Sequence, residues 1–485
     1  MARSTSRSTD RPNVVLVNCD DLGYGDLACY GSEVHDTPVL DQLATDGIRL
    51  TDFYVASPVC TPSRGALMTG CYPSRFGFDS FDGMHVLFPG MRFGLAPSEI
   101  TIARMLKDAG YATQMVGKWH CGDQTDFLPT NHGFDSWYGL PYSNDMGRQG
   151  DGMPEGMADF MESNFRIAIQ DGDYPPLPLM LDDTVQEEQP DQAALTERYL
   201  QESLRFMREK RDEPFFLYFA HMYVHLPIYV QDRFQRESRN GSYGAAVRCI
   251  DWALDVLLHE LDALGLTDDT VVIFTSDNGA LARPGEGSNL PLRATKGTTW
   301  EGGQRVPCIV RWPGRVPAGS TSDAVATAMD FLPTFAEWCG GSVPDDRTID
   351  GRSLAPLLEG REESSPHEAF FYYQGANLEA VRVGKWKLHV AKSGWHEEQS
   401  PDMTELYDLE TDVGETDDVS ADHPDVVVEL QAHIDRARAD LGDGLTETTG
   451  ADVRPVGEVD DAVPLTVWNP EHPYYIAAYD LGDRG

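Results

Sequence analysis

The sequence predicts an α/β protein with a large, mostly parallel sheet flanked by helices, followed by a smaller antiparallel sheet with one helix. Short apolar runs of the buried-strand type alternate with amphipathic helical stretches up to about residue 365, which is typical of a parallel sheet covered on both faces. Beyond that point the strands are shorter and alternate in polarity. We therefore predict a main α/β domain over residues 10–365 and a smaller α+β domain with an acidic tail over residues 366–485.

The main domain is expected to contain five clear strands and three clear helices. Each strand is a short apolar run, whereas the helices carry apolar residues three or four positions apart, such as Leu40 and Leu43. Gly110 is the expected end of the second helix. The strands are expected at residues 14–18, 111–117, 214–220, 270–276 and 306–312, and the helices at 37–47, 97–110 and 245–264.

Two segments have a different character. Residues 141–190 are rich in Gly, Pro, Met and acidic side chains with weak periodicity, which predicts an irregular excursion that shapes access to a site. The smaller domain is expected to have strands at 369–373, 378–383 and 386–391, a helix at 424–441, and an acidic, loop-like end over 442–485.

The chain is strongly acidic, with 79 Asp and Glu residues against 38 Lys and Arg and a formal net charge of −41. Such a surface stays hydrated at high salt, where screening suppresses self-repulsion. We therefore predict a halophilic protein, with an ordinary acidic protein as the alternative. The charge argues against nucleic acid as a partner, although a locally positive site for an anionic substrate is compatible with it.

The sequence contains no apolar run of about 18 residues, so no membrane partner is expected. The N-terminus is polar and has no apolar segment of a secretory signal, which predicts a cytoplasmic protein unless a signal has been removed. Eight cysteines are scattered without CxxC pairs. In a chain of this size they predict buried free thiols and not a disulfide scaffold.

Polar residues follow several predicted strands, at the edge where ligands bind in open α/β sheets. Asp20 and Asp21 follow the first strand, and Asp277 and Asn278 follow the fourth. Taken alone, the first pair is also compatible with a turn or helix cap, and the second with an Asn-Gly turn. Together, their oxygen atoms suit Ca²⁺ or Mg²⁺ better than zinc.

Cationic groups and one cysteine complete the candidate set. Cys60 precedes a helix-compatible run, with Arg64 one turn further on. A lone cysteine at such a place is commonly structural, and His221 and His225, spaced i and i+4, lack the HExxH zinc pattern. A divalent cation with cationic groups is what a sulfate or phosphate ester requires, because the charge on its oxygens must be compensated. The other candidates are Lys118, His120, His225 and Lys296; the first and last belong to a set of only seven lysines.

These motifs and their order resemble the type I sulfatases of the alkaline phosphatase superfamily, and within them look most like arylsulfatase A and N-acetylgalactosamine-6-sulfatase. The resemblance covers roughly residues 12–420, and its CxPSR pattern is specific. It rests on PNVVLVNCDDLGYG (12–25), CTPSRGALMTG (60–70), GKWH (117–120), GFDSWYGLPYSND (133–145), HLP (225–227), SDNG (276–279), KGTTWEGG (296–303), DGRSL (350–354) and ELYDL (405–409).

The resemblance implies an alkaline phosphatase-like fold and a role for each candidate. A maturation enzyme would convert Cys60 to formylglycine, whose hydrate Arg64 would hold. His120 would contact the second hydroxyl of that hydrate, and Ser143 would add a hydrogen bond. The metal, Ca²⁺ with Mg²⁺ as the alternative, would be bound by Asp20, Asp21, Asp277, Asn278 and the modified Cys60. The sulfate oxygens would be held by Lys118, His225 and Lys296.

The mechanism implied by the resemblance is hydrolysis of aryl or carbohydrate sulfate esters through a covalent sulfo-enzyme intermediate. One hydroxyl of the formylglycine hydrate attacks sulfur, and the alcohol leaves with a proton from His225 or Lys296. The second hydroxyl then loses its proton to His120, and sulfate is expelled as the aldehyde re-forms. A serine at position 60 would accept sulfate but would lack this route for expelling it.

Two other functions remain open from the sequence. A phosphonate or phosphate ester hydrolase is one, because related enzymes share the fold, the metal and formylglycine, although KGTTWEGG and GLPYSND favour a sulfatase. A non-catalytic carbohydrate-binding protein with an unmodified cysteine is the other. The sequence makes no prediction of the natural substrate or of the oligomeric state.

Overall fold

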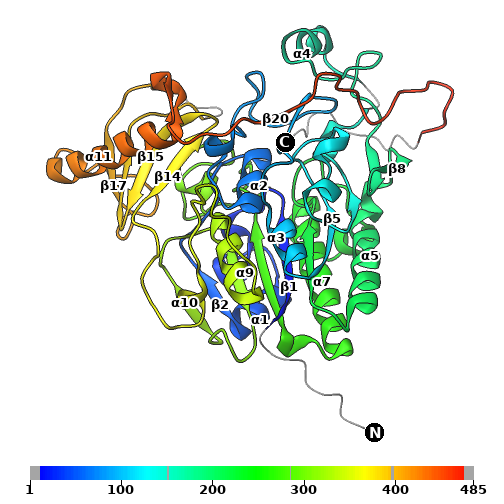
Figure 1. The fold of residues 1–485 in the computed structure, drawn as a ribbon, viewed down its shortest axis with the longest axis horizontal. Coiled ribbons are helices and arrows are strands. Elements are labelled where there is room, and N and C mark those ends of the chain that lie inside the picture. Colours follow the sequence, from blue (N-terminus) through cyan, green and yellow to red (C-terminus); the bar gives the residue numbers. More distant parts are fainter. Residues whose placement is uncertain (1–10, 150–151, 284–285, 395–397, 475–485) are drawn as a thin grey trace.

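The fold is a large mixed sheet between two layers of helices, with a smaller sheet beside it (Figure 1). The computed structural model describes residues 11–149, 152–283, 286–394 and 398–474. Within them the large sheet has ten strands, in the order β12-β2-β11-β10-β1-β9-β5-β6-β7-β8. In that order the bounds are Ser320–Ser322, Ile48–Leu50, Cys308–Arg311, Thr270–Ser276, Asn13–Cys19, Phe215–Ala220, Ala112–Gly117, Ser136–Gly139, Pro178–Leu181 and Thr184–Glu188.

The centre of the large sheet is parallel, and its flanks are mixed. Strand β1 pairs in parallel with both β9 and β10, and β5 pairs in parallel with β9 and β6. Strand β11 runs antiparallel to β10, and β7 and β8 extend the far edge in antiparallel fashion. The predicted fold class, a mostly parallel sheet flanked by helices, is therefore confirmed.

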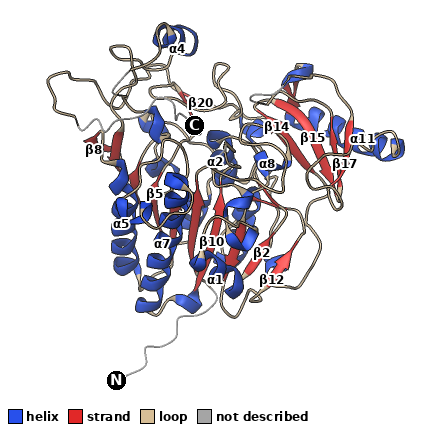
Figure 2. Ribbon diagram, turned by 180° about the vertical axis from the view of Figure 1, so that it is seen from behind, coloured by secondary structure: helices blue, strands red, loops and turns tan. Residues whose placement is uncertain are grey.

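Alternate residues of the central strands enter two separate cores. Leu16 of β1 packs with the face covered by α2 (Cys60–Thr69), α3 (Ile102–Asp108) and α9 (Phe331–Cys339). Val17 packs with the opposite face. The helices that cover this opposite face are α1 (Pro38–Asp46), α5 (Leu195–Lys210) and α7 (Gly241–Leu264), labelled in Figure 2. Because both faces are buried, the central strands are almost entirely apolar.

The smaller sheet is antiparallel, in the order β14-β15-β16-β17, and α11 (Pro424–Leu441) packs on it. Its strands are Phe370–Gln374, Asn377–Val383, Trp386–His389 and Glu405–Asp408. The sheet and helix confirm the predicted architecture of this region, whereas the domain boundary at residues 365 and 366 stays a prediction. Short strands β18 (Gly442–Asp443) and β19 (Thr448–Thr449) follow α11.

The chain then returns to the large domain. Strand β20 (Gly457–Glu458) pairs with β4 (Phe93–Gly94), a short strand between α2 and α3. Arg454 donates to both carboxylate oxygens of Glu99, at 2.8 and 3.0 Å. Val463 and Gln124 exchange two hydrogen bonds of 2.9 and 3.0 Å. Residues 452–474 thus lie along the loops of the large domain (Figure 1).

Several element boundaries differ from the predictions. Helix α3 begins at Ile102 instead of residue 97, because the Thr101 hydroxyl caps it by accepting from the Arg104 N–H. The excursion over 141–190 is not wholly irregular: it contains α4 (Met157–Phe165) and the edge strands β7 and β8. Helix α7 begins at Gly241, earlier than predicted.

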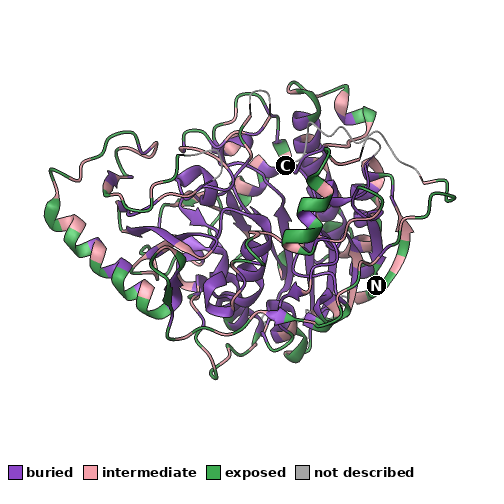
Figure 3. Ribbon diagram, turned by 90° about the horizontal axis from the view of Figure 1, so that it is seen from above, coloured by how far each residue is buried: buried purple, intermediate pink, exposed green. Residues whose placement is uncertain are grey.

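Exposed residues follow the outer helices and loops, whereas buried ones fill the centre (Figure 3). Among the described residues, no helix is both long and apolar enough to cross a bilayer.

Salt is expected to stabilise this acidic protein. From about 1 M to about 0.01 M KCl the Debye length grows from about 3 to about 30 Å, so repulsion within the net charge of −41 becomes unscreened. We expect the unfolding temperature to fall by more than about 2–4 °C. For a domain of 150–250 residues, a shift of that size corresponds to a loss of roughly 1 kcal/mol in the free energy of unfolding. Thermal unfolding in KCl and in sucrose of equal osmolality separates screening from water activity. A Tm that does not change with KCl would contradict the halophilic prediction.

Candidate active site

The candidate residues meet at the carboxyl edge of the large sheet. Strand β1 ends at Cys19 and β10 at Ser276, and these two residues are paired in register. Asp20 and Asp21 therefore emerge beside Asp277 and Asn278, as expected for neighbouring parallel strands.

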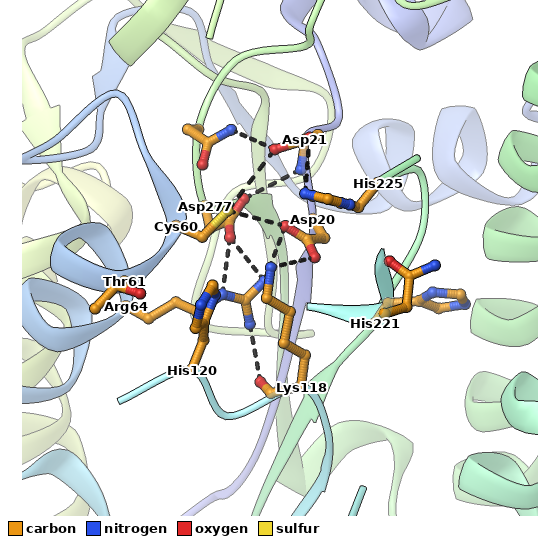
Figure 4. Close-up of polar contacts among 12 residues, drawn as sticks. Asp20, Asp21, Cys60, Thr61, Arg64, Lys118, His120, His221, His225 and Asp277 are labelled. Carbon is orange, nitrogen blue, oxygen red and sulfur yellow. Dashed lines mark hydrogen bonds and ion pairs between the residues drawn. The ribbon is translucent and has the colours of Figure 1, made fainter. Parts of the chain in front are cut away.

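Three carboxylates and one thiol form a compact cluster. One ligand atom from each of Asp20, Asp21, Cys60 and Asp277 lies within 4.8 Å of all the others. Figure 4 shows these side chains pointing toward one another. Asp21 has a positive φ of 61°, and its N–H donates to Asp277 Oδ1 at 3.1 Å. This backbone conformation is sparsely populated for residues other than Gly.

Asn278 supplies a further oxygen. Its Nδ2 donates to Asp21 Oδ1 at 2.7 Å, which fixes the amide. Its Oδ1 is buried and has no hydrogen-bond partner among the described residues. A buried carbonyl oxygen without a partner is uncommon unless it faces an ion or water. Three carboxylates with such an oxygen fit a hard divalent cation, Ca²⁺ or Mg²⁺.

Cys60 is the first residue of α2, a helix whose ten residues are all buried. Its Sγ lies 3.5 Å from Asp20 Oδ1, and the residue is 2% exposed. Burial raises the pKa of the Cys60 thiol, and Lys118 and Lys296 oppose that shift only in part. Since the thiolate is the reactive form, the unmodified cysteine is a poor nucleophile here.

Arg64 connects α2 with the carboxylates. Its Nε and one terminal nitrogen lie 2.8 and 2.7 Å from Asp277 Oδ2, and its other terminal nitrogen donates to the Lys118 carbonyl at 3.0 Å. The Ser63 hydroxyl donates to the Asp277 carbonyl. Buried ion pairs with additional hydrogen bonds of this kind hold side chains in one geometry.

Two buried lysines face the same cluster. Lys118 Nζ donates to Asp20 Oδ2 at 2.7 Å, and Lys296 Nζ donates to Asp21 Oδ2 at 2.9 Å. Burial would lower the pKa of each ammonium, but the aspartates outweigh it and raise both values. Burial likewise opposes ionisation of Asp20, whose pKa nevertheless lies well below its usual range because of Lys118 and Arg64. The site therefore holds fixed positive charges beside the ionised carboxylate of Asp20.

Two histidines lie at the rim of this charge cluster. His120 Nε2 is 2.9 Å from the Leu87 carbonyl, and its Nδ1 is buried without a hydrogen-bond partner in the described structure. His225 Nδ1 is 2.6 Å from the Leu226 carbonyl, and its Nε2 is 3.8 Å from Asp21 Oδ2. Burial lowers the pKa of both imidazoles, which favours their neutral forms.

The hydrogen bonds of Ser143 and His221 go to residues outside the carboxylate cluster. Ser143 is buried at the start of η6 (Asn144–Met146), where its carbonyl accepts from Met146, and its role in the site stays a prediction. His221 Nδ1 accepts the Tyr223 N–H at 3.0 Å, and its Nε2 is 3.4 Å from the Thr196 hydroxyl. These contacts give His221 a structural explanation.

The structure also brings in residues that the sequence did not single out. Lys387, on β16, has a fully buried side chain whose Nζ lies 3.0 Å from Glu301 Oε1 and 2.8 Å from Glu415 Oε1. It also donates to the Thr299 carbonyl at 2.9 Å. Glu415 Oε2 accepts the Glu301 N–H at 2.8 Å. The smaller sheet and the loop after β17 thus hold the segment that follows Lys296.

The same segment also contacts the start of α2. The Gly297 N–H donates to the Pro58 carbonyl at 2.9 Å, and the Lys296 N–H donates to Ala280 at 3.0 Å. The ring of Trp300 lies 4.1 Å from that of His389. A continuous set of contacts therefore runs from the smaller sheet to the residues around Cys60.

Comparison with known proteins identifies this architecture. A family model described as Sulfatase matches residues 12–341, and a second, described as N-sulphoglucosamine sulphohydrolase, C-terminal, matches residues 295–440. Human arylsulfatase A is 39% identical over 429 residues, covering 83% of this chain and 82% of the relative. N-acetylgalactosamine-6-sulfatase of Rattus norvegicus is 40% identical over 399 residues, covering 78% and 71%. Steryl-sulfatase of Rattus norvegicus is 38% identical over 441 residues, covering 79% and 76%.

Comparison with solved structures shows the same fold over most of the chain. The crystal structure of Ps i-CgsB superposes with a TM-score of 0.76 at 28% identity, covering 91% of this chain and 95% of the other. The PsFucS1 sulfatase from Pseudoalteromonas sp. gives a TM-score of 0.75 at 26% identity, covering 88% and 91%. The site geometry and these similarities lead to one conclusion: the chain belongs to the sulfatase family and is a sulfuric ester hydrolase of alkaline phosphatase-like fold.

Proposed function

We propose that the protein hydrolyses aryl or carbohydrate sulfate esters by using a formylglycine derived from Cys60 and a divalent cation, Ca²⁺ or alternatively Mg²⁺. The observation that carries the proposal is the thiol of Cys60 within 4.8 Å of three carboxylate groups. Sulfur is a soft ligand that hard cations do not favour, and burial raises the pKa of this thiol. An oxygen-bearing group at position 60 would complete an all-oxygen set of ligands and supply a better nucleophile.

In this proposal Asp20, Asp21, Asp277 and Asn278 hold the cation. When bound, the cation supplies Lewis acidity that neutralises charge on the reacting oxygens. The formylglycine hydrate would supply the oxygen nucleophile and carry the sulfuryl group between the two halves of the reaction. Its formation requires a maturation enzyme that acts on the segment Cys60–Arg64.

The remaining residues bind the ester and move protons. Lys118 and Lys296 compensate charge on the sulfate oxygens, and removal of one such group typically costs about 10²–10³ in rate. Arg64 orients residue 60 through its contacts with Asp277. His225 donates a proton to the leaving oxygen, with Lys296 as the alternative donor. His120, whose buried Nδ1 has no hydrogen-bond partner among the described residues, accepts the proton during release of sulfate.

Mass spectrometry of the tryptic peptide Leu50–Arg64 tests the proposal. Active protein is expected to yield a peptide in which the thiol of Cys60 has been replaced by an aldehyde. Active protein with only an unmodified cysteine would overturn the formylglycine mechanism.

Comparing p-nitrophenyl sulfate with the corresponding phosphate and a phosphonate ester tests the reaction class. Much faster turnover of a phosphorus ester would overturn the sulfatase assignment of the main activity.

Removal of the cation is expected to abolish most activity and to lower stability. Without it, three buried carboxylates lie together with fewer positive charges to compensate them, which buried charges tolerate poorly. Dialysis against EGTA or EDTA, with activity and Tm followed in parallel, provides the measurement. Re-addition of Ca²⁺ should restore both quantities, and Mg²⁺ serves as the comparison. Full activity and an unchanged Tm in metal-free protein, verified by elemental analysis, would contradict the proposed metal site.

A further inference from the structure

One carboxylate outside the proposed metal site receives no hydrogen bond or ion pair from the described residues. Asp145 lies in η6, is 8% exposed and has a buried Oδ1 without a hydrogen-bond partner. The described residues provide no hydrogen bond or ion pair to either oxygen of this carboxylate. A carboxylate that is more than nine-tenths buried is costly unless a donor compensates it. Asp145 is therefore suited to a donor that arrives with a ligand.

The turn that carries Asp145 is attached to the loop of His225. Asn144 Nδ2 donates to the Pro227 carbonyl at 2.9 Å and to Gln192 Oε1 at 2.9 Å. Gln192 Nε2 donates back to the Asn144 carbonyl at 3.2 Å. Burial lowers the pKa of His225, and Asp145 is one of the carboxylates that oppose this shift. Asp145 thus lies on the His225 side of the site, where the proposed mechanism has the leaving alcohol.

The charge of Asp145 defines what it can bind. A carboxylate repels the sulfate group, which is placed among Lys118, Lys296 and the cation in the proposed function. It accepts strong hydrogen bonds from neutral donors such as hydroxyl and amide N–H groups. A simple phenol bears no such donor beside the ester oxygen, whereas a sugar bears several.

We propose that Asp145 is a specificity-determining residue that accepts a hydrogen bond from a hydroxyl or amide N–H group of the leaving alcohol. The natural substrate is then a carbohydrate sulfate rather than a simple aryl sulfate. This inference rests on the proposed sulfatase function and deepens it by naming the substrate class.

The test compares two kinds of leaving group. Wild-type protein is assayed with p-nitrophenyl sulfate and with a panel of monosaccharides sulfated at the 2-, 3-, 4- or 6-position. Asp145→Ala should lower kcat/KM for the best sugar sulfate by about 10- to 100-fold, the value of one hydrogen bond to a charged group. The same variant should stay within about threefold of wild type on p-nitrophenyl sulfate. Asp145→Asn, which keeps one acceptor oxygen, should lose less than Asp145→Ala.

A matched control and a second measurement complete the design. Asp159→Ala, at an exposed position of α4, should leave both activities unchanged. Deoxy versions of the best sugar sulfate, assayed with the wild type, should identify one hydroxyl whose removal costs the same 10- to 100-fold. Asp145→Ala should show no further loss on that deoxy substrate, as expected for two partners of one interaction. This measurement with the wild type does not depend on the folding of any variant.

Three results would overturn the proposal. The first is an equal loss on both substrate types, especially with a shifted pH profile on p-nitrophenyl sulfate, since Asp145 would then act through His225. The second is no loss on either. The third is a wild type that cleaves p-nitrophenyl sulfate but no sugar sulfate. Failure of the proposed function looks different: protein with formylglycine at position 60 and bound metal would cleave none of these sulfate esters.

Discussion

Replacement of Cys60 by alanine is expected to lower kcat for a sulfate ester by about 10⁶, the scale on which removal of a covalent nucleophile acts. The change leaves the carboxylates, both lysines and Arg64 in place. Substrate binding should therefore survive, which equilibrium binding of p-nitrophenyl sulfate to the variant can measure. Residual turnover within tenfold of wild type would show that the nucleophile is elsewhere.

Two further variants separate chemistry from packing. Cys60→Ser keeps an oxygen nucleophile but lacks the second hydroxyl, so it should release at most one equivalent of alcohol and then stop. Cys249→Ala removes another buried thiol, in α7 and outside the described cluster, and should retain activity. A steady turnover by Cys60→Ser would argue against the need for two hydroxyls at this position.

Replacement of Lys387 by methionine is expected to cost about 3–5 kcal/mol of unfolding free energy, the usual loss when one partner of a buried ion pair is removed. Glu301 and Glu415 would then face each other in the protein interior without the ammonium that lies 3.0 and 2.8 Å from them. Because the same contacts hold the segment after Lys296, kcat should fall as well. Chemical denaturation and steady-state kinetics measure the two effects.

The chain provides a matched lysine and a rescue. Lys385 pairs with Asp408 on the surface, with 42% of its side chain exposed, so Lys385→Met should cost less than about 1 kcal/mol. Combining Lys387→Met with Glu415→Gln removes one unpaired negative charge and should recover part of the loss. If Lys387→Met and Lys385→Met were equally stable, the buried contacts of Lys387 would contribute no more to stability than a surface ion pair.

The central elements were predictable because their patterns are local. Strand β10 lies at the predicted residues 270–276, and α11 at the predicted 424–441. The direction of a strand could not be predicted in the same way. Strand β11 is antiparallel to β10, and nothing in its four residues, which are apolar or half-buried, indicates that direction. Strands β7 and β8 were missed because a segment rich in acidic and Pro residues forms them at the sheet edge, where one side needs no apolar pattern.

Parallel strands end at one edge of a sheet, and this rule predicted the proximity of four residues: Asp20, Asp21, Asp277 and Asn278. Lys387 was not predictable in the same way, because lysines are almost never fully buried unless paired, and its partners come from distant segments. Asp145 lies within a quoted motif, yet only the structure identifies it as buried and without a hydrogen-bond partner for Oδ1 among the described residues. Sequence patterns thus predicted the location of the candidate active site, whereas its individual side-chain contacts could be identified only from the three-dimensional structure.

The return of residues 452–474 to the large domain has a consequence for the timing of biosynthesis. The chain is made from its N-terminus, and about 400 residues separate Cys60 from β20, the strand that pairs beside β4. At about 5–20 residues per second, roughly 20–80 s pass between the two. Throughout that interval the loops around the site lack their last partners, and before β10 appears β1 lacks a neighbour. If Cys60 is converted to formylglycine as proposed, the maturation enzyme would reach it during translation, before the folded chain buries the residue to 2% exposure.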